Sequence, residues 1–105
     1  MKAINKTLLE SLQAIEPADN LELSLAKVLK AQAEDKLRYH KSLISYYQKR
    51  YGMTGEEFYR TKIENKSHGW EEEETYFDWI TAQQEAEEME REIAKLEDIL
   101  SHGDD

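Results

Sequence analysis

The stretch from Leu25 to Tyr51, LAKVLKAQAEDKLRYHKSLISYYQKRY, decides the fold. Apolar or amphipathic side chains recur along it every three or four residues, a spacing that places them on one side of an α-helix. This stripe consists of Leu25, Leu29, Ala33, Leu37, His40, Ile44, Tyr47 and Tyr51. The segment is therefore predicted to form one long helix with a continuous packing face.

A second stretch carries a matching stripe, whose members recur in alternating steps of three and four residues. This is the heptad pattern of helices that pack along their length. The stripe consists of Trp79, Ala82, Ala86, Met89, Ile93, Leu96 and Leu100. A second long helix is predicted here.

The two stripes match when the helices run in opposite directions, because facing residues of an antiparallel pair have numbers with a nearly constant sum. The sum is 125 or 126 for Tyr47 with Trp79, Ile44 with Ala82, His40 with Ala86, Leu37 with Met89, Ala33 with Ile93, Leu29 with Leu96 and Leu25 with Leu100. Large side chains often face small ones, as interdigitated packing requires. The sequence predicts an all-α fold, an antiparallel and coiled-coil-like helical hairpin.

The remaining segments complete a single helical domain over residues 1–105. A short N-terminal helix is expected within 1–16 and ends before Pro17, which cannot continue a helix. The long helices are expected at 20–51 and 70–101. Between them, Gly52 suits a left-handed cap, and Thr54 with Glu57 forms a capping box that begins a short connecting helix over 55–65.

Two apolar stretches outside the hairpin seam leave alternatives open. The stripe of Trp70, Phe77 and Ile80 is either covered by Phe58, Tyr59 and Ile63 in a small three-helix core, or exposed as a binding surface. The N-terminal helix either folds back on the open end of the hairpin, near residues 21–29 and 93–100, or docks on a partner chain.

Composition narrows the classes of function. The chain has no cysteine, so disulfides and thiolate metal sites are excluded, and it has no apolar run of membrane-spanning length. We expect a cytoplasmic protein that does not bind membranes. The net charge of −9 is uneven: +3 over residues 1–51, zero over 52–69 and −12 over 70–105. Such an acidic surface attracts basic proteins and disfavours nucleic acid.

A basic patch interleaved with tyrosines lies on the first long helix. It contains Lys27, Lys30, Lys36, Arg38, Lys41, Lys49 and Arg50, with Tyr39, Tyr46 and Tyr47. These cations are expected to complement the acidic helix of the same hairpin rather than nucleic acid.

No sequence motif of catalysis or cofactor binding is present, and we expect neither an enzyme nor a bound cofactor. His68, which precedes a run of glutamates, is the one candidate for a metal ligand. The carboxylate pairs of the second long helix lack the Glu-x-x-His repeats of di-iron bundles and are more simply a solvated face.

The run from Tyr51 to Trp79, YGMTGEEFYRTKIENKSHGWEEEETYFDW, resembles small helical bacterial and archaeal antitoxins of type II toxin–antitoxin pairs. In those proteins a helix ends in Tyr-Gly-Met, a capped E-E-F helix follows, and an acidic segment leads through Phe-x-Trp into a charged helix. The resemblance extends to about Leu100. It implies a compact helical protein that blocks a basic toxin, often an RNase, encoded by an adjacent gene. The DNA-binding module of many antitoxins has no counterpart in this sequence.

The leading hypothesis is therefore a non-enzymatic antitoxin that neutralises a basic toxin through an acidic helical face and aromatic anchors. The candidate partner-binding residues are Trp70, Glu71, Glu72, Glu73, Glu74, Phe77, Asp78, Ile80, Glu85 and Glu88. The alternative is a helical structural or adaptor protein that self-associates through leftover apolar residues such as Leu8, Leu9 and Leu12, with a homodimer as the simplest form.

Overall fold

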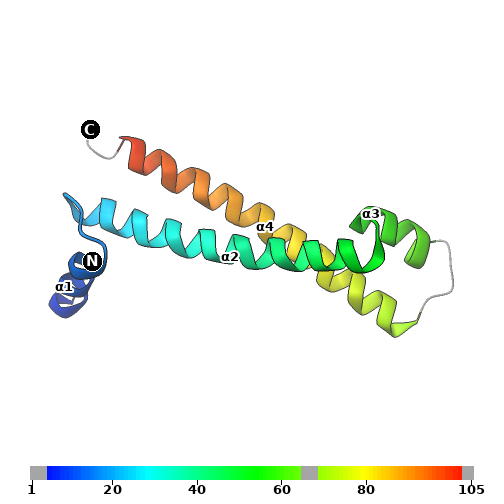
Figure 1. Cartoon of the computed structure of the whole chain (residues 1–105). Helices are drawn as coiled ribbons and strands as arrows, with labels where there is room; N and C mark the ends of the chain where they lie inside the picture. Colours follow the sequence, from blue (N-terminus) through cyan, green and yellow to red (C-terminus); the bar gives the residue numbers. More distant parts are fainter. Residues whose placement is uncertain (1–4, 65–68, 103–105) are drawn as a thin grey trace.

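A computed structural model describes residues 5–64 and 69–102 of the chain (Figure 1). These residues form helices α1 (Lys6–Ile15), α2 (Leu21–Tyr51), α3 (Gly55–Phe58) and α4 (Trp70–His102), with a π-helical segment η1 (Tyr59–Glu64) directly after α3. The described residues contain no β-strand. The all-α prediction is confirmed.

Helices α2 and α4 pack against each other in opposite directions (Figure 1), and the described structure as a whole is a rod of 58 × 26 × 26 Å. Two contacts between the arms show the antiparallel pairing, the first of them a predicted pair. Tyr47 stacks on Trp79 with ring centroids 5.4 Å apart, and Lys30 Nζ lies 3.6 Å from Glu97 Oε2. The pairing read from the sequence is therefore correct at Tyr47 and Trp79, whereas the predicted packing face is wrong at the open end: Leu25 and Leu29 are 41% and 54% exposed, and Leu23 and Ala26 are buried instead.

The core is concentrated at the closed end, where the chain turns from α2 into α3. Trp79 is fully buried and Phe58 is 1% exposed, and the two rings lie 5.4 Å apart. The ring of Tyr51 packs against both, with its centroid 6.0 Å from that of Trp79 and 4.9 Å from that of Phe58. Elsewhere the buried apolar side chains are Leu23 and four alanines, Ala26, Ala33, Ala82 and Ala86.

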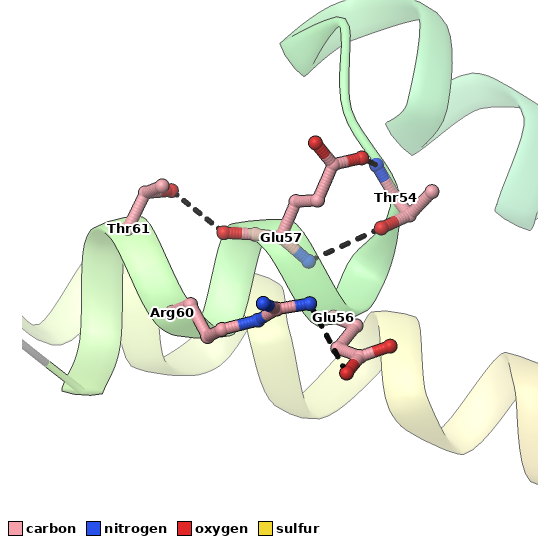
Figure 2. Close-up of polar contacts among 5 residues, drawn as sticks. All are labelled: Thr54, Glu56, Glu57, Arg60 and Thr61. Atoms are coloured by element: carbon pink, nitrogen blue, oxygen red, sulfur yellow. Dashed lines mark hydrogen bonds and ion pairs between the residues drawn. The ribbon is translucent and has the colours of Figure 1, made fainter.

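The corner between α2 and α3 has the predicted geometry. Gly52 adopts a left-handed conformation (φ 66°), which suits glycine because it has no Cβ, and its N–H donates to Gln48 O at 2.8 Å. Figure 2 shows the capping box: Glu57 N–H donates to Thr54 Oγ1 at 3.1 Å, and Thr54 N–H donates to Glu57 Oε1 at 3.0 Å. Two backbone donors that a helix start leaves open are thereby satisfied.

Gly55 lets this corner approach α4 closely. A Cβ at this position would lie 3.3 Å from Trp79 Nε1 and 3.2 Å from Gln83 Nε2. The absence of a side chain thus seats the first turn of α3 against the edge of the buried indole.

Of the two alternatives for α1, folding back on the open end of the hairpin is met only on the α2 side. Helix α1 contacts α2, where Gln13 Nε2 donates to the buried Ser24 Oγ at 3.3 Å, but none of its Cα atoms lies within 8 Å of α4. Ser24 is two residues before Ala26, which puts it nearly on the opposite side of α2 from the α4 seam. Leu8 and Ile15 consequently remain 66% and 76% exposed.

Replacing Trp79 should remove the centre of the closed-end core. We expect Trp79→Ala to lower the free energy of unfolding by about 3–5 kcal/mol, because a large fully buried ring is lost and a cavity remains. Urea unfolding followed by far-UV circular dichroism at one protein concentration measures the change. Trp70→Ala is the matched control and should change stability by less than about 0.5 kcal/mol, since Trp70 is exposed. Equal losses in both variants would contradict this account of the core.

The capping box should make stability depend on acid pH. The hydrogen bond from the Thr54 backbone N–H, joined by that from its hydroxyl, holds the pKa of Glu57 below its ordinary value. A lowered carboxyl pKa contributes stability above the unfolded value of about 4.3, and the contribution is lost as the pH falls through the lower folded value. We expect Glu57→Gln to be less stable than the parent at neutral pH and to approach it below about pH 4.

Chemical denaturation of both proteins over a pH series tests this expectation. Glu56→Gln controls for the loss of one negative charge on the same helical turn. A difference between parent and Glu57→Gln that grows as the pH falls would contradict the assigned role of Glu57.

Candidate functional site

Two large aromatic side chains are exposed on the outer face of α4. Trp70 is 74% exposed and Phe77 is 68% exposed. They are seven residues apart, about two helical turns, and so lie on the same side of α4. Trp79 is nine residues from Trp70, about half a turn away around the axis, and faces the core. The helix thus presents one aromatic side to the hairpin and another to solvent.

The expected three-helix cover over Trp70, Phe77 and Ile80 is not formed over the two aromatic rings. Phe58 turns inward to Trp79 and Tyr51, because the capping box places it on the side of α3 that faces the core. Tyr59 packs on Tyr76 instead, with ring centroids 5.0 Å apart. Ile63 and Ile80 are half-buried. The alternative interpretation, an exposed apolar surface, is the one that the structure has.

The exposed aromatics and three carboxylates line a shallow hollow of about 410 Å³. Its residues are Trp70, Glu73, Glu74, Phe77 and Asp78. Glu73 and Glu74 follow Trp70 by three and four residues and therefore lie between the two rings on the same face of the helix. We call these five residues the acidic aromatic surface. Its chemistry suits an apolar side chain or a cation, because aromatic faces and carboxylates both attract positive charge.

The other predicted partner-binding residues lie around this surface rather than in it. Glu72 is half-buried, and its Oε2 accepts from Gly69 N–H at 2.9 Å, so it serves the start of α4. Glu71 and Glu72 line a neighbouring hollow instead. Glu85 and Glu88 lie farther along the outer face, about two and three turns beyond Phe77.

The neighbouring hollow, of about 480 Å³, includes residues that sequence reasoning did not single out as a site. It is lined by Arg50, Tyr51, Phe58, Lys62 and Thr75 together with Glu71, Glu72, Glu74 and Asp78. Arg50 donates to Tyr46 Oη at 3.2 Å, and its guanidinium lies 5.7 Å from the centre of the Tyr51 ring. The sequence feature that could have indicated this hollow is the position of Arg50 at the end of α2, immediately before the predicted corner.

Negative charge dominates α4. Its 33 residues carry twelve Asp or Glu against two Lys or Arg. Asp78 also affects a neighbour: the pKa of Tyr47 is raised, first by burial and then by the negative charge of Asp78. The Lys30–Glu97 pair joins the arms near the open end, whereas Arg38 pairs with Asp35 on its own helix. The basic face of α2 therefore offsets only part of the acidic charge.

Neither a cluster of metal ligands nor a membrane-spanning helix is found among the described residues. Within residues 5–64 and 69–102, no group of three or more His, Asp or Glu side chains is arranged to hold a metal ion. The metal candidate His68 lies outside these residues, so that hypothesis stays a prediction. None of the described helices is long and apolar enough to span a membrane.

Comparison of the chain with protein-family models, with curated proteins and with solved structures found no match.

The difference between the two tryptophans predicts a two-component fluorescence response. We expect acrylamide, a neutral quencher, to quench Trp70 readily and to leave Trp79 protected, because Trp70 is 74% exposed and Trp79 is fully buried. Stern–Volmer plots of the parent should curve, and Trp70→Phe should lose the accessible component. A parent protein with two equally protected tryptophans would mean that the acidic aromatic surface is covered in solution.

Proposed function

We propose that this protein is a non-enzymatic binding protein of the antitoxin kind, which neutralises a basic protein toxin, possibly an RNase, encoded by an adjacent gene. The observation that carries the proposal is the exposure of Trp70 and Phe77 on the most acidic helix of the chain. Exposed Trp and Phe side chains are costly in water and are the kind of residue that anchors protein interfaces.

The geometry supports a specific manner of recognition. A lysine or arginine side chain of the toxin lies between the rings of Trp70 and Phe77, where it gains cation–π attraction, and the carboxylates of Glu73, Glu74 and Asp78 surround its charge. An RNase binds phosphates with cationic side chains, so a row of carboxylates competes for the same groups. The protein would therefore block the toxin by occupying its substrate-binding site, without any catalytic step.

The charge of the rest of α4 supports fast association. Glu85 and Glu88 extend the negative face beyond the acidic aromatic surface, and complementary charge accelerates encounter more than it strengthens the final complex. Affinity is then supplied mainly by burial of the two rings. The two contributions are separable, since salt screens the first far more than the second.

Co-expression with the product of the neighbouring gene tests the proposal. We expect a basic protein to copurify with the tagged chain, and its toxicity to growth to be relieved. Trp70→Ala and Phe77→Ala should each weaken binding by about 30-fold or more, because anchors of this kind are worth about 2 kcal/mol or more. Affinity and association rate are measured by surface plasmon resonance at two salt concentrations.

Tyr39→Ala is the matched control, because Tyr39 is a 62% exposed aromatic residue on the other arm of the hairpin. It should change affinity by less than about 2-fold. The proposal fails if no basic partner copurifies, or if a partner binds equally well to the Trp70 and Phe77 variants.

A further inference from the structure

A second apolar surface lies at the opposite end of the rod. Two hollows, of about 190 and 260 Å³, run along the groove between α2 and α4 and share Leu29 and Leu96. Leu25, Leu29 and Ile99 on this groove are 41%, 54% and 43% exposed. Helix α1 lines neither hollow. This open-end groove is distinct from the acidic aromatic surface and plays no part in the function proposed above.

The α2 side of the groove has a self-complementary pattern. Glu22, Leu25, Leu29, Gln32 and Lys36 follow one another in steps of three and four residues and so form one outward stripe. Leu29 lies at its centre. Glu22 and Lys36 are each seven residues, about two turns, from Leu29. The stripe thus carries a negative charge at one end and a positive charge at the other, with apolar side chains between.

We propose that a second copy of this chain packs on the open-end groove, with α2 antiparallel to α2 of the other copy and the two-fold axis near Leu29. The two Leu29 side chains then meet each other, and Glu22 of each copy faces Lys36 of the other. A two-fold contact requires such a surface, in which every residue finds its complement on an identical copy. The outcome is a four-helix bundle built from two hairpins.

Charge complementarity selects a second copy as the occupant. Within the described chain neither Glu22 nor Lys36 has an ion-pair partner, although both border the groove. Antiparallel pairing about Leu29 supplies both partners at once and does so twice per dimer. Leu96 and Ile99 of α4 form the other wall of the groove. The same contact buries them and so adds a second apolar layer over the open half of the hairpin, where few large side chains are fully buried.

Sedimentation velocity of the full chain over a wide concentration range tests the proposal. We expect a reversible monomer–dimer equilibrium in the parent. Leu29→Glu should weaken the dimer by at least about 100-fold, because it places two carboxylates against each other in an apolar contact. Circular dichroism reports whether this variant folds.

Charge-reversal variants test the proposed pairing of Glu22 with Lys36 of the other copy, and they do so even if Leu29→Glu does not fold. Glu22→Lys and Lys36→Glu should each weaken the dimer by about 5-fold to 10-fold, since each creates two like-charge contacts. The double variant should return to within about 2-fold of the parent, because the pairs are restored with opposite sign. Lys27→Glu, an exposed reversal on the opposite side of α2, is the control and should leave the equilibrium unchanged.

A parent that is monomeric at every concentration would overturn the proposal. So would a double variant that dimerises no better than the single reversals, because a dimer through another surface would not sense their pairing.

Discussion

The fold depends on the burial of one indole. Trp79 joins the three elements of the closed end, since Tyr47 and Tyr51 stack on it from α2, Phe58 packs on it from α3, and it belongs to α4 itself. Gly55 makes room at its edge. Beyond this cluster the buried seam residues are Leu23 and four alanines, and the larger seam side chains are only half-buried, so the aromatic cluster supplies most of the large apolar side chains that are fully removed from water. Register, corner and helix direction are all set around it.

This arrangement explains why α4 has two different aromatic sides. Trp79 faces inward, whereas Trp70 and Phe77 occupy the other side of the same helix and cannot reach the core without unpairing the hairpin. The short α3 is too close to the corner to wrap around α4. The exposure of the two rings on this acidic helix therefore follows from how the closed end packs.

The sequence predicted what is local or repetitive. The heptad spacing gave the antiparallel pairing, which Tyr47 and Trp79 confirm, and the Gly52, Thr54 and Glu57 pattern gave the corner. Two packing alternatives that the sequence left open were decided by the structure. Phe58 could cover the outer stripe, but spacing alone cannot say which side of a four-residue helix faces the core. Helix α1 could fold back on the hairpin or dock on a partner chain, and the structure places it against α2 alone, with one contact to Ser24. The acidic aromatic residues were identified as candidates, whereas their grouping into a hollow required the orientation of α4.

The uneven burial along the hairpin has a further consequence for motion. Toward the open end the large apolar side chains are half-buried or exposed and bury less area per turn than the aromatic cluster, so the free energy that holds the arms together decreases from Trp79 toward the chain ends. Local opening should start where α2 begins and α4 ends and should proceed as a zipper toward the aromatic cluster. Amide protons near Ala82 and Ala86 then exchange with solvent far more slowly than those near Leu96. The closed end is rigid, whereas the open ends of α2 and α4 separate transiently.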